Sequence, residues 1–343
     1  MYPMFRTLSL SLLLYAFLAV GCKQHNVFDQ SPAERMQHHI ENFRQTLVSA
    51  PHGWRLQYFP RVDSLLFRNP TIRLDWTDVT KDKYGYGGYL MLIKFAESNR
   101  LEIKADFTDL QAKNITAAEY DIRLGSSLQL SFTTHSPLHE LVNTELGGVS
   151  DFVYRYRDYW GNLIFTTGVS GDSNRPYIVL SPLKTAEEWK HGAEQAFENR
   201  KFFEGMIHPQ LRIRRGSRIF FQSDVPFKNS EDDQDKKKEL ERNRRRYHIF
   251  LSYRDKYNPI FKGYNGLGSG YTGTKEGLSF RPGFSYDAKT TFFDFERKGD
   301  KFVAELVSVY DPLSQKFHFV SKHLFPEGEP TSYIAEIVDT HKQ

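Results

Sequence analysis

The stretch Leu101-Glu102-Ile103-Lys104-Ala105-Asp106-Phe107 alternates strictly between apolar and charged side chains. Successive side chains of a β-strand point to opposite faces of the sheet, so this period of two places the apolar residues on one face and the charged residues on the other. An antiparallel strand with one buried face and one face in water has this pattern. The stretch therefore predicts a strand, and residues 54–58 alternate in the same way, whereas residues 89–95 form a more continuous apolar strand.

Seven more segments of the first half have strand patterns, and short turn sequences such as Gly125-Ser126-Ser127 separate them. These segments are residues 54–58, 89–95, 120–124, 128–132, 152–157, 162–167 and 177–180. Strands that follow one another so closely pair as an antiparallel meander, which forms a sandwich or closes into an up-and-down barrel. The aromatic content of 15% suits the half-buried surfaces of such sheets.

A helix is predicted directly before the first strand. Ser31 can cap it, Pro32 fits its first position, and Glu34 completes a capping box. Pro51-His52-Gly53 ends this helix, so the indole of Trp54 should lie where helix and sheet meet. An apolar stripe at helical spacing would face the sheet; its members are Met36, Ile40, Phe43 and Leu47.

A second helix is predicted over residues 185–203, where Thr185 and Glu188 repeat the capping-box spacing. Further strand patterns follow it at 211–214, 218–222, 247–253, 290–297, 302–310 and 317–320. We therefore expect a mainly β protein with antiparallel meander sheets, an N-terminal helix and a mid-chain helix that divides two sandwich-like or barrel-like lobes. A single long β domain wrapped around the second helix is the alternative.

The N-terminus has the features of a bacterial lipoprotein signal. Apolar residues 8–20 are too few to span a bilayer as a helix, and Leu18-Ala19-Val20-Gly21-Cys22 places small residues before the only cysteine of the chain. We expect cleavage before Cys22 and lipidation of its thiol, and a chain with one cysteine forms no internal disulfide. An ordinary secretory signal that happens to end in cysteine is the alternative.

The expected organisation follows from these segments. It comprises a signal peptide at 1–21, a tether at 22–30, the N-terminal helix and first β lobe at 31–183, the dividing helix at 184–205, and a second β lobe at 206–343. The second lobe contains a charged insert, residues 230–246, which begins acidic and turns basic. A contact site for a polyanion is one interpretation, and we favour a solvated loop or short helix whose opposite charges satisfy each other locally. The net charge of +4 does not call for nucleic-acid binding.

Two motifs resemble functional sites. The run Gly268-Ser269-Gly270-Tyr271-Thr272-Gly273 matches G-x-G-x-x-G, but a dinucleotide site needs a helix after it and a strand pattern follows here. We interpret this run as a flexible surface loop. His135 and His139 with Glu140 offer three metal-ligating side chains, yet Pro137 opposes the helix that would align the two imidazoles. We therefore expect a loop there, no metal site, no catalytic set and no cofactor.

Aromatic residues around the glycine-rich run at 84–88 are the candidate ligand site. Trp76, Tyr84, Tyr86 and Tyr89 lie on or beside a loop that precedes a strand, where exposed rings can stack on sugars or peptide side chains. The alternative is that these rings close the end of the β core.

Several short motifs resemble an uncharacterised family of lipoproteins from Bacteroides-type bacteria, a domain of unknown function. They are residues 27–35, 50–54, 87–89, 136–139, 150–152, 180–183 and 277–282, and the likeness covers nearly the whole mature chain. Members often lie near genes for SusC/SusD-like outer-membrane importers, which implies a role in nutrient capture. The family supplies no catalytic residues. Val149-Ser150 stands where glycine-aspartate is expected, and the charged insert is peculiar to this chain.

Together these observations predict a lipoprotein anchored in the outer membrane, on its periplasmic or cell-surface face. We expect an accessory binding protein that captures a glycan or peptide beside a SusC/SusD-like importer. A surface hydrolase, metal-assisted through His135 and His139, and a structural envelope subunit are the alternatives.

Overall fold

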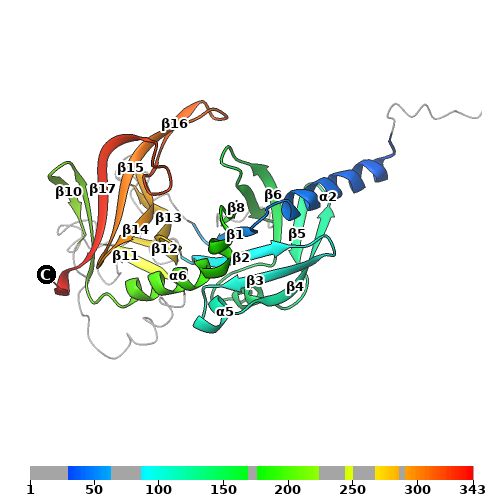
Figure 1. The fold of residues 1–343 in the computed structure, drawn as a ribbon, viewed down its shortest axis with the longest axis horizontal. Coiled ribbons are helices and arrows are strands. Elements are labelled where there is room, and N and C mark those ends of the chain that lie inside the picture. Colours follow the sequence, from blue (N-terminus) through cyan, green and yellow to red (C-terminus); the bar gives the residue numbers. More distant parts are fainter. Residues whose placement is uncertain are drawn as a thin grey trace, which may run out of the picture. The chain divides into compact units, whose positions relative to one another are not determined.

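The computed structural model describes residues 30–62, 86–168, 176–223, 244–249, 267–285 and 290–342. The chain is mainly β, with two antiparallel sheets and two long helices, as its sequence predicts (Figure 1). Contacts group residues 1–42 apart from a compact unit of residues 43–343, and this second unit contains both sheets.

The first sheet is a closed barrel of eight strands that pair in sequence order, with β1 pairing β8 to complete the ring. Of the two architectures that the meander allows, the barrel is the one observed. Its strands are β1 (Trp54–Phe59), β2 (Tyr89–Phe95), β3 (Arg100–Ala105), β4 (Thr116–Leu124), β5 (Leu128–Phe132), β6 (Asp151–Arg157), β7 (Leu163–Thr167) and β8 (Tyr177–Pro182).

Aromatic and aliphatic side chains fill the barrel. Tyr58, Phe152 and Phe165 are fully buried, and the rings of Tyr58 and Phe152 meet edge to face at 5.4 Å. Ile103, from the alternating stretch that defines β3, is buried among them as predicted. The expectation of a wet opposite face is wrong at Lys104 and Asp106, because both are buried where β3 passes under a helix.

The first helix, α2 (Pro32–Val48), begins with the predicted capping box. The Ser31 amide donates to Glu34 Oε2 at 2.7 Å, and the Glu34 amide donates to Ser31 Oγ at 3.2 Å. These bonds lower the pKa of Glu34 because they favour its carboxylate form. Of the predicted stripe, Phe43 and Leu47 are buried and Met36 is exposed, so only its C-terminal half packs as expected.

The second helix, α6 (Ala186–Glu204), contacts both sheets. Thr185 caps it and accepts from the Glu188 amide at 3.3 Å, as predicted. Leu90 and Leu92, on the outer face of β2, pack against its alanines, which explains why β2 is apolar on both faces. The same helix contacts β12 and β13 of the second sheet, so it connects the two sheets as well as separating them in sequence.

The second sheet has the order β10-β9-β17-β15-β14-β13-β12-β11, with β16 paired to β15 off this path. Its strands are β9 (Pro209–Arg215), β10 (Arg218–Gln222), β11 (Arg246–Ile249), β12 (Leu267–Gly273), β13 (Gly277–Ser285), β14 (Thr291–Lys298), β15 (Lys301–Asp311), β16 (Lys316–Ser321) and β17 (Glu329–Asp339). The glycine-rich run expected as a flexible surface loop is strand β12, and that expectation is wrong. A Cβ at Gly273 would lie 1.8 Å from the Ala196 carbonyl oxygen, so glycine is required for β12 to pass so close to α6.

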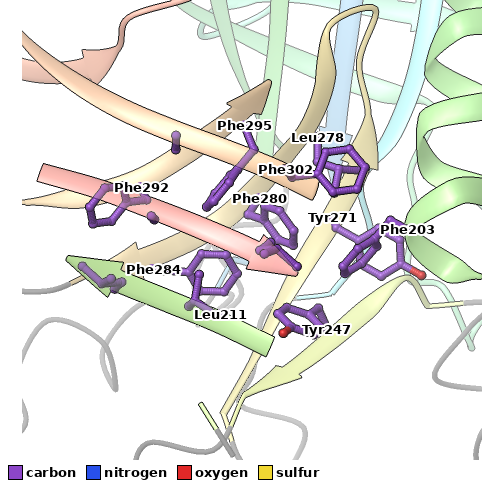
Figure 2. Packing of buried hydrophobic residues seen from close by; sticks show 14 of the residues in the cluster. Phe203, Leu211, Tyr247, Tyr271, Leu278, Phe280, Phe284, Phe292, Phe295 and Phe302 are labelled. Carbon is purple, nitrogen blue, oxygen red and sulfur yellow. The ribbon is translucent and has the colours of Figure 1, made fainter. Parts of the chain in front are cut away.

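A cluster of aromatic side chains forms the core of this sheet (Figure 2). Phe203 extends from α6 into it, with its ring 5.0 Å from Tyr271 and 5.8 Å from Phe280. Edge-to-face rings at these separations add to the hydrophobic gain of burial. The last turn of α6 is thereby fixed to the second sheet.

Candidate functional site

The aromatic site predicted before β2 is not an exposed surface at the described positions. Tyr86 is 8% exposed and Tyr89 is 3% exposed, so their expected exposure is wrong. The Tyr89 ring lies 5.5 Å from Phe107, and burial raises the pKa of its hydroxyl to about 12. Burial of both rings is what the alternative interpretation, in which they close the end of the β core, expects. Trp76 and Tyr84 lie outside the described residues.

The two candidate metal ligands lie in the connection between β5 and β6. A 3₁₀ helix, Pro137–Leu141, begins at the proline that the sequence marks as an obstacle to an α-helix. The rings of His135 and His139 are 6.0 Å apart, and His139 Nδ1 lies 3.1 Å from Ser136 Oγ. Within the described residues, no group of three or more His, Cys, Asp or Glu side chains is arranged to hold a metal ion.

A buried ionic cluster joins the barrel to the second sheet. Asp106, directly after β3, has no exposed surface, and Arg245 Nη1 donates to its two carboxylate oxygens at 2.9 and 3.0 Å. Arg200 of α6 places its Nε 3.4 Å from the same carboxylate. The expectation that the charged insert is a solvated loop is therefore wrong at its end, where Arg245 is buried; residues 230–243 lie outside the described residues.

The other members of the cluster complete its neutralisation. Arg200 Nη1 donates to Glu204 at 2.8 Å, and Tyr271 Oη donates to the same Glu204 oxygen at 3.3 Å. Burial alone would raise the pKa of the Glu204 carboxyl. The positive charge of Arg200 and its hydrogen bond favour the carboxylate more strongly, so the pKa of Glu204 is lowered. Each charged member of the cluster has an oppositely charged partner within it, and we interpret the cluster as a structural connection. We therefore look for a ligand site elsewhere.

A hollow of about 310 Å³ lies on the second sheet, and we refer to it as the charged hollow. It is lined by two residues of β14, two of β15 and three of the turn after β16: Glu296, Lys298, Val303, Glu305, Lys322, His323 and Pro326. Alternation along the strands explains the lining. Glu296 pairs with Val303 across the β14–β15 ladder, and residues that face each other in a ladder lie on the same side of the sheet.

Acidic and basic side chains pair around this hollow. Lys322 Nζ lies 2.8 Å from Glu305, and Lys298 Nζ lies 3.0 Å from Glu296. All four side chains keep a substantial exposed surface, so an incoming charged group can replace part of each pair. The hollow therefore presents both signs of charge to a ligand.

His323 is the half-buried member of the lining. Burial lowers its pKa, although the nearby carboxylates of Asp294, Glu276 and Glu296 act in the opposite direction. An imidazole with a lowered pKa is neutral at pH 7, so it offers one donor and one acceptor nitrogen. Glu276 also holds a buried oxygen, Oε2, with no hydrogen bond from the described residues.

An aromatic contact from the barrel supports the turn that carries His323. Trp160, between β6 and β7, places its ring 5.7 Å from Phe325 and 6.0 Å from His318. Phe325 directly precedes Pro326 of the lining. The turn is thus packed on one side by an indole and open on the other to the hollow.

Comparison with known proteins gives a family without an assigned activity. A family model described as a domain of unknown function, DUF4302, matches residues 24–299. The chain belongs to this family. No curated protein and no solved structure matches the chain significantly. The match ends before β15, so Glu305, Lys322 and His323 lie beyond the family model.

Among the described helices, none combines the length and the apolar character needed to cross a bilayer.

Proposed function

We propose that the protein is a lipid-anchored binding protein of the bacterial cell envelope that captures a small polar ligand in the charged hollow. The observation that carries the binding proposal is the hollow itself, where two lysines, two glutamates and a histidine surround about 310 Å³. Small-molecule sites have volumes of about 300–1,000 Å³ and orient their ligand with a few polar groups.

The anchor and the cellular role rest on the sequence. Cys22 follows a short apolar segment and small residues, which supports lipidation and attachment to the outer membrane. The resemblance to lipoproteins encoded near SusC/SusD-like importers supports a role in nutrient uptake beside such an importer.

The lining favours a short peptide over a neutral glycan. A peptide carries an ammonium group for Glu296 or Glu305 and a carboxylate for Lys322, whereas a neutral sugar would leave these charges without a charged partner. The neutral imidazole of His323 can hydrogen-bond to either end of a peptide group.

Calorimetric titration with triglycine tests this function, with di-N-acetylchitobiose as the glycan probe. We expect the parent protein to bind triglycine, and Lys322→Ala to weaken that affinity by about 10- to 100-fold, since hydrogen bonds to charged groups contribute about 1.5–3 kcal/mol. Lys113→Ala is the matched control, because Lys113 pairs with Asp109 at the same 2.8 Å on a distant helix, α5 (Asp109–Lys113).

The outcomes separate the alternatives. Equal triglycine affinity in the parent and in Lys322→Ala would remove the charged hollow as the site. Binding of the chitobiose probe alone would assign a glycan ligand and overturn the peptide proposal. Binding of neither probe by the parent protein would contradict the proposed ligand class.

A further inference from the structure

The end of the β15–β16 hairpin exposes large apolar side chains. Leu313 is 68% exposed, Phe317 is 66% exposed and Tyr310 is 48% exposed. We refer to residues 310–317 as the hairpin tip. Soluble proteins seldom gather large apolar side chains on one projecting turn unless that turn contacts an apolar phase or a partner.

The hairpin tip projects from its sheet. β15 pairs with β14 only at its beginning, near Phe302, and with β17 as far as Ser308. From Val309 to Asp311, within the described residues, β15 pairs with β16 alone. Figure 1 accordingly shows this orange hairpin extending beyond its neighbouring strands.

The exposed side chains are held in place. Tyr310 lies directly opposite Phe317 in the ladder, so both rings lie on one face, with their centroids 5.2 Å apart. The Leu313 amide donates to Asp311 Oδ1 at 2.9 Å, which closes the turn and fixes Leu313 at its end. On the opposite face, Trp160 packs against His318.

The exposed charge of the hairpin tip is cationic, which suits an anionic lipid surface. Its two charged residues are Asp311 and Lys316. Asp311 is buried, and His318 Nε2 lies 3.5 Å from its carboxylate, whereas Lys316 is exposed. The tip therefore presents exposed apolar and aromatic side chains and one exposed cation, Lys316, together with the uncharged polar residues Ser314 and Gln315. These are the properties of segments that lie in the interfacial zone of a membrane, where aromatic rings and lysines are both favoured.

We propose that the hairpin tip inserts Leu313 and Phe317 into the lipid surface. This inference rests on the membrane location in the proposed function, but not on the ligand. A lipid at Cys22 and an apolar hairpin give two attachment points, and reversible binding by one signal becomes stable with two. The second attachment fixes which face of the molecule points away from the membrane.

Vesicle co-sedimentation tests the tip without the anchor. The protein used is the chain from residue 22 onward with Cys22→Ser, which contains every described residue and carries no lipid. We expect it to sediment with vesicles of phosphatidylethanolamine and phosphatidylglycerol. The double variant Leu313→Ser, Phe317→Ser should bind these vesicles with an affinity lower by a factor of about 10 or more. Leu110→Ser is the matched control, since Leu110 is 69% exposed on α5.

The double variant should keep the thermal melt and triglycine affinity of its parent, because both substituted side chains are exposed and outside the charged hollow. Equal sedimentation of the two proteins, or none by the parent, would overturn the proposal. If the parent dimerises through the hairpin tip and does not bind vesicles, the tip is an interface between two copies of the chain, and the membrane proposal is overturned. The triglycine result is independent of all these outcomes.

Discussion

Trp54 joins the first helix to the barrel through both its ring and its nitrogen. The side chain is buried, and its Nε1 donates to the Leu47 carbonyl at 2.7 Å. Leu47 is in the last turn of α2, where carbonyls have no partner within the helix. The predicted position of the indole, between helix and sheet, is confirmed. Trp54 therefore packs a large ring between helix and sheet and also supplies a hydrogen-bond donor for a carbonyl in the last turn of α2.

Substitution of Trp54 separates these two contributions. Trp54→Ala should lower the free energy of unfolding by about 3–5 kcal/mol, since a large buried ring is lost. Trp54→Phe keeps a buried ring and leaves the Leu47 carbonyl without its donor, so its loss should be smaller, about 1–3 kcal/mol. Denaturant unfolding measures both changes. Equal losses in the two variants would show that the ring's burial contributes little.

Sequence patterns located Trp54 but not Arg245, and the reason is physical. The position of Trp54 follows from local signals, because Pro51 and Gly53 end the helix and a strand pattern begins at once. Arg245 lies in a run of charges, which ordinarily marks a solvated surface. Its partner Asp106 is 139 residues away, so no local pattern reports the pair.

At the scale of elements, the contact between α6 and β12 depends on an absent side chain. Gly273→Ala would place a methyl group against the Ala196 carbonyl oxygen, and backbone atoms cannot rotate away as a side chain does. We expect a loss of about 1–3 kcal/mol in the free energy of unfolding, as for other overpacked sites. Gly125→Ala is the matched control: no heavy atom lies within 4 Å of its Cβ, so the change should stay within about 0.5 kcal/mol.

Thermal or denaturant melts of the two alanine variants decide this prediction. A Gly273→Ala protein as stable as Gly125→Ala would mean that α6 and β12 are not in close contact.

The glycines of β12 also explain why no sequence pattern predicts this strand. Glycine gives no apolar or polar signal, so a strand such as Leu267–Gly273 shows no alternation. Barrel strands such as β3 and β4, which alternate in their side chains, are predicted by that alternation, and β2 is predicted by a continuous apolar run.

No local sequence pattern marks the charged hollow. Its residues come from β14, β15 and the turn after β16, and its lysines and glutamates resemble ordinary surface residues within their own segments. Only the pairing of Glu296 with Val303, and the return of the chain at Lys322, bring them together. Topology of this kind depends on which strands become neighbours, and the linear pattern does not encode it.

At the scale of the whole molecule, the two sheets are joined by helix α6 and by the cluster around Asp106. The helix packs on β2 through Leu92 and inserts Phe203 into the second core. The cluster adds buried ion pairs across the same junction through Arg200 and Arg245. Two sheets joined in this way should move as one unit.

The anchor prediction concerns this whole molecule. In cells that express the full chain, the parent should fractionate with membranes and incorporate labelled palmitate, because the lipid on Cys22 is expected to provide stable attachment. Cys22→Ser removes the thiol that would carry the lipid, so the label should disappear and the protein should move to the soluble fraction after washing. Lys23→Ala is the matched control, since it changes the neighbouring residue and leaves the thiol in place.

The proposed hairpin insertion sharpens the expected result. A single apolar tip binds lipid reversibly, so Cys22→Ser protein should leave membranes progressively with repeated washing, and the further changes Leu313→Ser and Phe317→Ser should make its release complete in the first wash. Unwashed membranes should therefore retain more of the Cys22→Ser protein than of the triple variant. Retention of the triple variant through all washes, with no palmitate label in the parent, would contradict the lipid anchor and point to a protein partner as the attachment.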